Sequence, residues 1–463
     1  MNISIKQIIK VVGGKPSGGD CSRKITTVAI DSRKVVPGSM FVAFAGEHAD
    51  GHDYLEECAR KGAFAALVER DTPQWGEMVT IRVDNTLAAL QRLAAWQRRQ
   101  LKGLQVLGIT GSSGKTTTKE LVAGVLAQKY SVFKSRGNHN NAIGLPLMIF
   151  ELEAHHQWAV LEMGMSARGE IKELCAIGRP GLGIITNIGE AHMEHLGSQQ
   201  AIMEAKFELA QDLKPPCLMI LNGDDPWQRR KVREGLPGVK VIFYGLNPEN
   251  SIRAVNIQTS AEGSSFDVEW SGKSIHVELG LLGAHNVMNA LAAFAAGLVL
   301  DIEPSAIASG LGLVRGEGRR LQPFEINGLT LIDDSYNANP DSMGKALAVL
   351  GTYPPGRRKV AFLGDMLELG PSSPDKHQQV GMVAAGQQLG LLVAVGSFAE
   401  DVKQGAIQAG MEEGAVITWP DSKVAGASVD SLLPGDVVLV KGSLGSEMDR
   451  IVQAIKAGRT EKC

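Results

Sequence analysis

The sequence predicts an α/β protein of three domains. Its 463 residues exceed one ordinary domain, since a domain typically has about 100–200 residues. Short apolar runs of strand length alternate with stretches of helical periodicity, which predicts parallel sheets covered by helices on both faces. Near residue 110, a glycine-rich turn joins one such strand to one such helix.

The composition is that of a globular protein, with 44% hydrophobic and 21% charged residues. A net charge of −3 argues against a general nucleic-acid binder, so no nucleic-acid partner is expected. The five cysteines are scattered without a Cys-x-x-Cys pair, which favours a reducing cytosol over a disulfide framework or a zinc ribbon. Lys6 and Lys10 interrupt any signal-peptide core, and the longest apolar run, 290–300, is too short to span a bilayer. We therefore expect a cytoplasmic protein without a membrane span.

The first predicted domain covers residues 1–84 and the second covers residues 85–314. In the first domain we expect strands at 25–30 and 40–45, a helix at 54–61, and a helix at 85–102 that leads into the second domain. In the second we expect strands at 104–109, 158–163, 182–188, 218–221 and 239–244, then an antiparallel annex at 252–257, 265–270 and 275–279, and a buried helix at 283–300.

The third predicted domain, 315–463, repeats the alternation of strand and helix. Expected strands lie at 329–332, 359–363, 391–395, 415–418 and 437–440, and expected helices at 342–350, 376–389, 400–409 and 422–432. This order predicts a doubly wound, Rossmann-like domain.

The glycine-rich turn has the composition of a phosphate-binding loop. Its candidate residues are Gly111, Ser112, Ser113, Gly114, Lys115, Thr116 and Thr117. Backbone N–H groups and the start of the following helix, expected at 119–130, would bind phosphate, Lys115 would reach the β- and γ-phosphates, and the Thr116 hydroxyl would face Mg²⁺. The spacing is shorter than the standard motif, because Ile109 stands where that motif has glycine. The alternative is a turn with a surface lysine, which the flanking strand and helix disfavour.

Two strand ends of the second domain carry residues that suit a metal ion. Glu162 ends the strand 158–163 and His192 follows the strand 182–188, at the sheet edge where ligands bind. The alternatives are a solvated acid and a merely structural histidine. Lys206, on a helical stretch, would by itself be an ordinary exposed lysine.

Amides and arginines mark two further places. Asn286 and Asn289 share one face at the start of the helix 283–300, where amides could read the edge of a base, although Asn286 could also be only an N-cap. Arg319 and Arg320 open the third domain, and the planar guanidinium group suits phosphate oxygens.

Polar loops follow three strands of the third domain, which predicts a second binding surface along one sheet edge. Plain turn chemistry is the alternative for the first loop. The candidates are Asp334, Tyr336, Asn337 and Asn339 in the first loop, Asp365 in the second (364–370) and 441–443 in the third.

Together, these motifs resemble the Mur ligase family, the ATP-dependent amide-bond-forming enzymes of peptidoglycan precursor synthesis, over essentially the whole chain. Residues 110–116 resemble the family's phosphate loop, which shares the shorter spacing, and 161–164 and His192 resemble its metal positions. The distance from His192 to Lys206 resembles the family's spacing to a lysine that becomes carbamylated. Arg320, followed by Leu-Gln, fits the family pattern better than Arg319.

Other stretches resemble the family's substrate sites. Residues 31–33, 37–38 and 41–43 are similar to its uridine-nucleotide-binding domain, and 334–340 and 364–370 are similar to the branch that uses D-alanyl-D-alanine. The Asp-Asn-Pro-Arg motif of the diaminopimelate-adding branch is absent from the sequence.

The resemblance implies a monomeric ligase that uses ATP, Mg²⁺, UDP-N-acetylmuramoyl-tripeptide (UDP-MurNAc-tripeptide) and D-alanyl-D-alanine and proceeds through an acyl phosphate. The central domain would be a P-loop ATPase-like sheet. The third would bind D-alanyl-D-alanine and complete the ATP site. Implied roles are catalysis for Lys115, His192 and Lys206; ATP binding for 111–117, Asn286, Asn289, Arg320 and Asp334; metal binding for Thr116, Glu162, His192 and carbamylated Lys206; and substrate binding for Ser32, Arg33, Asn140, Asn141, Tyr336, Asn337, Asn339 and Asp365.

Three other functions remain open at this point. A folylpolyglutamate synthase shares the ATP centre and would transfer glutamate. A kinase or GTPase also uses a phosphate loop, although the guanine-reading Asn-Lys-x-Asp is absent. A non-catalytic nucleotide switch would need the loop but not the third-domain residues.

Overall fold

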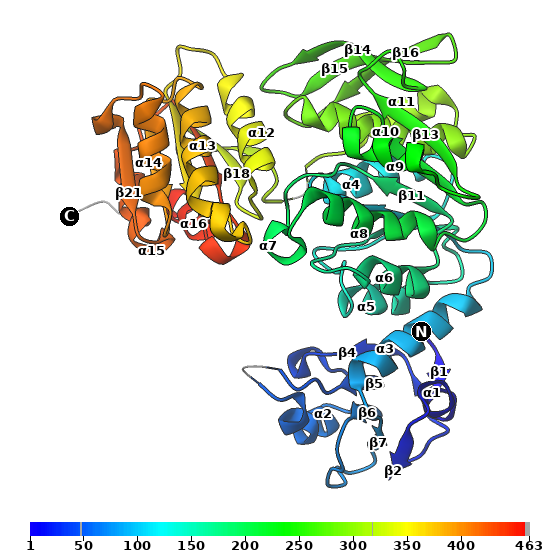
Figure 1. Cartoon of the computed structure of the whole chain (residues 1–463). Helices are drawn as coiled ribbons and strands as arrows, with labels where there is room; N and C mark the ends of the chain where they lie inside the picture. Colours follow the sequence, from blue (N-terminus) through cyan, green and yellow to red (C-terminus); the bar gives the residue numbers. More distant parts are fainter. Residues whose placement is uncertain (47–48, 317, 459–463) are drawn as a thin grey trace.

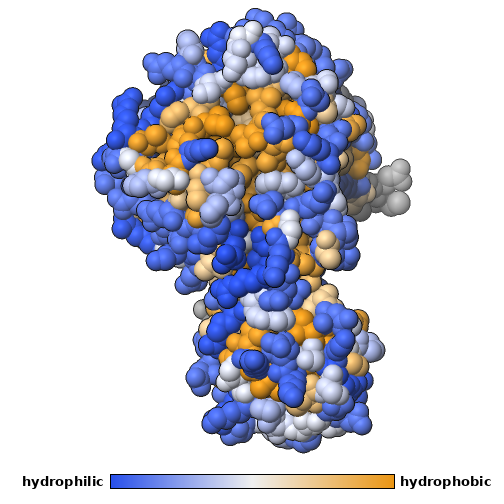
Figure 2. Space-filling view, turned by 90° about the vertical axis from the view of Figure 1, so that its right-hand side faces the viewer, coloured by the Kyte–Doolittle hydropathy of each residue, from blue (hydrophilic) through white to orange (hydrophobic). Residues whose placement is uncertain are grey.

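The chain folds into three α/β lobes that follow one another in sequence (Figure 1), and this confirms the predicted fold class. The computed structural model describes residues 1–46, 49–316 and 318–458. Among these residues, none of the helices has the length and apolar composition needed to cross a membrane. Figure 2 shows hydrophilic residues around the rims of two lobes and hydrophobic residues exposed at the centre of the larger one.

The first lobe is built on a five-stranded sheet with a small two-stranded sheet beside it. Its elements are β1 (Ile3–Ser4), α1 (Ile5–Val12), β2 (Lys15–Ser17), β3 (Lys24–Ile25), β4 (Thr27–Ala29), β5 (Ser39–Val42), α2 (Leu55–Arg60), β6 (Ala65–Val68), β7 (Val79–Arg82) and α3 (Thr86–Gln100). The larger sheet has the order β2-β7-β6-β5-β4, parallel except for β2.

Helix α3 connects the first lobe to the middle lobe. The Asn85 side chain caps it by accepting a hydrogen bond from the N–H of Ala88. Its apolar residues Ala89, Leu90 and Leu93 are buried in one core that extends from the sheet of the first lobe into the middle lobe. Each fully buried leucine contributes about 1.5–3 kcal/mol through loss of apolar surface to water, so the packing holds the two lobes together.

The middle lobe contains a nine-stranded sheet with the order β16-β15-β14-β13-β12-β11-β8-β10-β9. Its elements are β8 (Gln105–Thr110), α4 (Lys115–Leu126), β9 (Val132–Lys134), α5 (Gly144–Phe150), β10 (Trp158–Glu162), α6 (Glu170–Gly178), β11 (Leu182–Ile185), α7 (Met193–Leu196), α8 (Gln199–Gln211), β12 (Leu218–Asn222), α9 (Pro226–Glu234), β13 (Lys240–Gly245), β14 (Ile252–Thr259), β15 (Ser264–Trp270), β16 (Lys273–Leu279), α10 (His285–Val299) and α11 (Pro304–Leu313). Helices α4, α10 and α11 pack on one face of this sheet.

Two features of this lobe differ from the predictions. The strands β14 to β16 are antiparallel as expected, but they continue the main sheet through parallel pairing of β13 with β14 rather than forming a separate annex. Helix α4 starts at Lys115, not at residue 119, because the left-handed Gly114 turns the chain directly into the helix. The polar residues Thr116 to Lys119 interrupt the apolar periodicity there, which hid the first turn from the sequence pattern.

The third lobe contains a six-stranded sheet with the order β17-β18-β22-β19-β20-β21, parallel except for β17. Its elements are β17 (Gln322–Ile326), β18 (Leu329–Asp334), α12 (Pro340–Gly351), β19 (Lys359–Gly364), α13 (Ser373–Ala385), β20 (Leu391–Val395), α14 (Ala399–Gln408), β21 (Val416–Trp419), α15 (Ser422–Ala425), β22 (Val437–Lys441) and α16 (Asp449–Ala457). The helix expected at 422–432 is instead the short α15 and a 3₁₀ helix, Gly426–Ser431. Glycine and serine have low helix propensity, so the tighter turn replaces the α-helix there.

Candidate active site

A cleft of about 710 Å³ lies where the carboxyl ends of the strands in the middle and third lobes face each other. In the middle lobe the register places the ends of β10 and β11 beside the end of β8, and in the third lobe it places β18, β22 and β19 side by side. The expected residues that line the cleft are Ser112, Ser113, Gly114, Lys115, Thr116, Thr117, Asn140, Asn141, Glu162, His192, Asn286, Asn289, Arg320, Asp334, Tyr336, Asn337 and Asn339.

The glycine-rich loop between β8 and α4 requires glycine at two positions. Gly114 has a φ of +78°, and a Cβ atom there would lie 2.6 Å from Oδ1 of Asn289. At Gly111, a Cβ atom would lie 1.8 Å from Oγ1 of Thr186. Helix α4 then begins without a side-chain cap, so its first N–H groups, which have no partner within the helix, are available to an anion.

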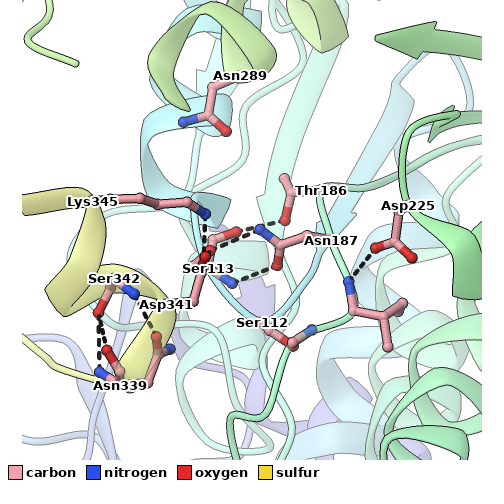
Figure 3. Close-up of polar contacts among 12 residues, drawn as sticks. Ser112, Ser113, Thr186, Asn187, Asp225, Asn289, Asn339, Asp341, Ser342 and Lys345 are labelled. Atoms are coloured by element: carbon pink, nitrogen blue, oxygen red, sulfur yellow. Dashed lines mark hydrogen bonds and ion pairs between the residues drawn. The ribbon is translucent and has the colours of Figure 1, made fainter. Parts of the chain in front are cut away.

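A neighbouring loop, which the sequence analysis did not assign to the site, holds the glycine-rich loop in shape (Figure 3). The Asn187 side chain accepts a hydrogen bond from the N–H of Ser113 at 2.9 Å and donates one to the Ser113 hydroxyl at 2.7 Å. Thr186 donates to the Ser113 carbonyl at 2.6 Å. Asp225, which caps α9, accepts from the N–H of Ile188 at 2.7 Å. Asn187 and Asp225 follow strands β11 and β12, so their positions after neighbouring strands were the signal available in the sequence.

Two lysines, Lys115 in the cleft lining and Lys206 on α8, interact electrostatically. Lys115 Nζ donates to the Gly111 carbonyl at 2.8 Å. Burial lowers the pKa of Lys115, and the charge of Arg320 adds to this while Glu162 opposes it. Lys206 is only 1% exposed, which rules out an ordinary surface lysine. Burial, aided by the charge of Lys115, brings the pKa of Lys206 well below its usual range, so its amine is driven toward the neutral form.

Thr116 and Glu162 form the part of the cleft best suited to Mg²⁺. The Thr116 hydroxyl donates to Glu162 Oε2 at 2.9 Å, and Asn140 donates to Oε1 at 2.8 Å. Among the described residues, no group of three or more His, Cys, Asp and Glu side chains could hold a metal by itself. Mg²⁺ commonly takes one or two carboxylates together with waters and substrate phosphates, so a hydroxyl and one carboxylate beside a phosphate loop fit it.

His192 lies at the boundary between the middle and third lobes. It precedes helix α7 with a left-handed φ of 64°, and its Nδ1 lies 2.6 Å from Oε2 of Glu368. Burial lowers the pKa of His192. Glu368 opposes this shift, and the charges of Lys115 and Lys206 add to it. The imidazole is therefore within electrostatic reach of both lysines.

The two amides and Arg320 also line the cleft. Asn286 is not an N-cap: it donates to the Leu282 carbonyl at 2.8 Å, and its Oδ1 accepts from Asn289, also at 2.8 Å. Arg320 lines the cleft with its guanidinium carbon 4.2 Å from the centre of the Tyr336 ring. Arg319 instead donates to the hydroxyl and carbonyl oxygens of Ser335, both at 3.1 Å. The geometry thus favours Arg320 as the ligand-facing arginine, as the sequence pattern did.

In the third lobe, the first polar loop is tied to the third by buried charges. Lys441, 1% exposed, donates to Asp334 at 2.6 Å and to the Asn337 carbonyl at 2.8 Å. Burial raises the pKa of Asp334, although Lys441 opposes the shift. Asn339 is the N-cap of α12 and forms a reciprocal capping box with Ser342, so the turn chemistry considered as an alternative is present at this residue.

A direct contact joins the glycine-rich loop to the third lobe (Figure 3). The Ser113 hydroxyl donates to Asp341 Oδ2 at 3.2 Å, and Lys345 donates to the same oxygen at 2.5 Å. The glycine-rich loop and the first turn of α12 therefore lie on the two walls of one cleft.

Three expected substrate residues lie elsewhere. Asp365 does not line the cleft; its carboxylate accepts from the N–H groups of Ser397 and Phe398 at 2.8 and 3.2 Å. Ser32 and Arg33 are in the first lobe, where Arg33 is exposed and paired with Asp31 at 2.8 Å. Their binding roles stay predictions.

Comparison with known proteins gives consistent results over nearly the whole chain. Residues 24–98 match the model described as the Mur ligase family, catalytic domain, residues 109–297 match the Mur ligase middle domain, and residues 319–444 match the Mur ligase, glutamate ligase domain. The UDP-N-acetylmuramoyl-tripeptide–D-alanyl-D-alanine ligase of Bacillus subtilis is 36% identical over 97% of each chain.

Solved structures agree with the sequence comparison. A crystal structure of MurF from Acinetobacter baumannii is 31% identical, covers 99% of each chain and has a TM-score of 0.89. The MurF ligase from Thermotoga maritima in complex with ADP is 28% identical, covers 93% of this chain and 97% of its own, and has a TM-score of 0.81.

Proposed function

The chain belongs to the Mur ligase family, and from this membership we propose that it is an ATP-dependent ligase that joins D-alanyl-D-alanine to UDP-MurNAc-tripeptide in peptidoglycan precursor synthesis. The observation that carries the proposal is full-length similarity to proteins named for this reaction. The site agrees with it, because the phosphate loop and the polar loops of the third lobe face one cleft.

The first chemical step would activate the tripeptide. Its terminal carboxylate attacks the γ-phosphorus of ATP, which gives an acyl phosphate and ADP. The N–H groups at the start of α4 and the ammonium of Lys115 would hold the phosphates, and Arg320 and Asn289, which also line the cleft, would contact the nucleoside. Positioning and neutralisation of charge supply most of the catalysis in such transfers.

The second step would form the amide bond. The free amine of D-alanyl-D-alanine attacks the acyl carbon, and inorganic phosphate leaves the tetrahedral intermediate. Tyr336, Asn337 and Lys345 line the third-lobe wall of the cleft, where the dipeptide would approach the acyl group. In this proposal 1–84 binds the uridine nucleotide, 85–314 carries the ATP centre and 315–463 receives the dipeptide.

We further propose that Thr116, Glu162 and His192 hold Mg²⁺ and that Lys206 is carbamylated. Mg²⁺ supplies neutralisation of the phosphate charge. The Lys206 carbamate would form when the neutral amine adds to CO₂ and releases a proton, and it would replace a repulsive ammonium with an anionic oxygen ligand. Burial of Lys206 and its lowered pKa support this modification.

We also propose a cytoplasmic location. The cysteines that the structure describes, Cys21, Cys58, Cys175 and Cys217, are free thiols, which fits a reducing cytoplasm. A monomer stays our prediction, and sedimentation velocity would test it.

Mass spectrometry of reaction products tests the function directly. The enzyme with UDP-MurNAc-tripeptide, D-alanyl-D-alanine, ATP and Mg²⁺ should give UDP-MurNAc-pentapeptide, ADP and phosphate in equal amounts. Omission of the dipeptide should stop formation of the pentapeptide. Transfer of glutamate would instead favour a folylpolyglutamate synthase, and ADP release that does not depend on any acceptor would favour a nucleotide switch.

A further inference from the structure

The closest polar contact of His192 comes from the third lobe. Its Nδ1 lies 2.6 Å from Oε2 of Glu368, a residue 176 positions away in the sequence. A carboxylate oxygen can only accept, so Nδ1 must carry the hydrogen. In the neutral ring Nε2 then carries the lone pair, and His192 lines the cleft beside the phosphate loop.

The loop that carries Glu368 is anchored at each preceding residue. The carboxylate of Asp365 accepts two N–H groups from the loop after β20. The N–H of Met366 donates to Nε2 of the buried His377 at 2.9 Å, and the N–H of Leu367 donates to the Ser443 hydroxyl at 3.0 Å. The loop is therefore fixed to the body of the third lobe, and from it the Glu368 side chain reaches His192 of the middle lobe.

Both members of the pair have an unusual backbone. The φ angles of His192 and Glu368 are 64° and 63°, in the left-handed region that residues with a Cβ atom seldom adopt. The N–H of Glu194 donates to the Glu368 carbonyl at 3.4 Å, so main chain and side chain both hold the two segments together. Local strain of this kind persists where surrounding contacts over-determine it and is found mainly at functional sites.

We propose that Glu368 is a positioning residue for His192: it fixes the imidazole with Nδ1 protonated and so reserves Nε2 as the metal ligand. Docking of the third lobe would thereby complete the metal site of the middle lobe. This inference rests on the proposed Mg²⁺-dependent function. It gives the segment 364–370 a role in addition to dipeptide binding, because its contacts within the third lobe serve to present Glu368.

A simpler role for the His192–Glu368 pair would be to hold the middle and third lobes together. The same interface offers a matched comparison, since Lys376 on α13 forms an ion pair of 2.8 Å with Glu190. That pair crosses the same boundary and involves no imidazole. If the two pairs only hold the lobes together, loss of either pair should weaken the contact between the lobes by a similar amount. Only loss of Glu368 would disturb the imidazole of His192.

The test compares Glu368→Ala, Glu368→Gln and Lys376→Met, each checked for folding by thermal unfolding. Mn²⁺, as a probe for Mg²⁺, is titrated by electron paramagnetic resonance with a non-hydrolysable ATP analogue present. Loss of a carboxylate that supports a metal-binding histidine typically weakens metal affinity by about 10–100-fold, and we expect this for Glu368→Ala. Glu368→Gln, whose amide oxygen still accepts from Nδ1–H, and Lys376→Met should bind as wild type does.

Nitrogen-15 NMR of the histidine rings in the metal-free protein gives a second readout. His192 should be protonated at Nδ1 in the wild type and in Glu368→Gln, and should shift toward the Nε2-protonated form in Glu368→Ala. Equal loss of Mn²⁺ affinity in Glu368→Ala and Lys376→Met would overturn the proposal, because the pairs would then only hold the lobes together. A His192 ring that stays protonated at Nδ1 in Glu368→Ala would also overturn it. Neither readout requires peptide substrates. A negative ligase assay would therefore be distinguishable from a negative result for the role of Glu368.

Discussion

The hydroxyl of Thr116 donates a hydrogen bond of 2.9 Å to Glu162, across 46 residues of sequence. The parallel pairing of β8 with β10, which sets Ile109 beside Glu162, makes the contact possible because both strands then end at the same level of the sheet. The glycine-rich loop therefore begins beside the carboxylate of Glu162, which ends the neighbouring strand β10 in the sheet. Oxygen atoms that suit a hard cation therefore lie beside N–H groups that suit phosphate.

Glu162→Gln should impair the use of Mg²⁺. An amide keeps the size of the side chain but removes the negative charge and one of the two acceptor oxygens. We expect the Mg²⁺ concentration for half-maximal turnover to rise by at least about 10-fold, since residues that only support metal ligands already have effects of this size. A Mg²⁺ titration of turnover measures it, and an unchanged midpoint would remove Glu162 from the metal site.

Lys115→Ala should nearly abolish turnover and leave stability intact. Removal of a charge that stabilises a transferring phosphoryl group costs on the order of 10²-fold or more in rate. The fold should not suffer, because burial already disfavours the charge of Lys115 and its ammonium donates to the Gly111 carbonyl of its own loop. Steady-state rates and thermal unfolding check both parts, and wild-type turnover in the folded variant would refute the phosphate-loop role.

Lys206→Arg should fold but lose most activity, because a guanidinium group stays protonated and cannot add CO₂. Wild-type activity should fall in CO₂-depleted buffer and return with bicarbonate. With ¹³C-labelled bicarbonate, NMR should show a carbamate carbon in the wild type and none in the variant. Lys172→Arg, at an exposed lysine of α6, is the control and should behave as wild type. Full activity of Lys206→Arg would exclude the carbamate.

Arg320→Ala and Arg319→Ala should have different effects. Arg320 faces the cleft over Tyr336, so its loss should weaken binding of an ATP analogue by about 10-fold or more, the range of a charge-assisted hydrogen bond of about 1.5–3 kcal/mol. Arg319 holds the Ser335 loop and pairs with Asp449 at 3.5 Å, so its loss should lower the thermal midpoint more than the affinity. Calorimetric titration and thermal unfolding of both variants separate the two effects. The reverse pattern would assign the ligand-facing role to Arg319.

His285 should make stability depend on pH. Burial, with the nearby charges of Lys345 and Lys441, lowers the pKa of His285 to about 4, although Asp341 opposes the shift. An unfolded histidine titrates near 6.5, so between these values the unfolded chain binds more protons than the folded one. Stability from this group is therefore present above about pH 6.5 and is lost as the pH falls toward about 4. Denaturant unfolding across this range should show a shallower pH dependence for His285→Gln than for wild type, and parallel curves would contradict the assignment.

Some of the site could be predicted because its signal is local. The phosphate loop needs a strand, two glycines, a lysine and a helix start in consecutive residues, and all of these are contained in 104–126. Glu162 and Asp334 were found for a related reason, since each ends an apolar strand and such ends gather at one edge of a parallel sheet. The alternation of strands and helices likewise fixed the class of fold.

Other parts depended on contacts that no local pattern encodes. The burial of Lys206 results from the packing of α8 against the sheet, and the bonds of Asn187 with Ser113 result from strand order. The sequence predicted Asp365 as a substrate-binding residue, and the structure adds that its carboxylate accepts a hydrogen bond from the N–H of Ser397; its binding role stays a prediction.

The sequence by itself therefore determined the three-part α/β architecture and the glycine-rich turn between strand and helix, because hydrophobic periodicity and turn chemistry act over a few neighbouring residues. It also determined the family, through motifs that resemble those of the Mur ligases. Only the tertiary structure decided which side chains meet: Ser113 with Asp341, Asp334 with Lys441, and His192 with Glu368. These partners are brought together by the non-sequential order of strands and by the docking of separate lobes. Such contacts depend on the whole packed chain rather than on any segment of it.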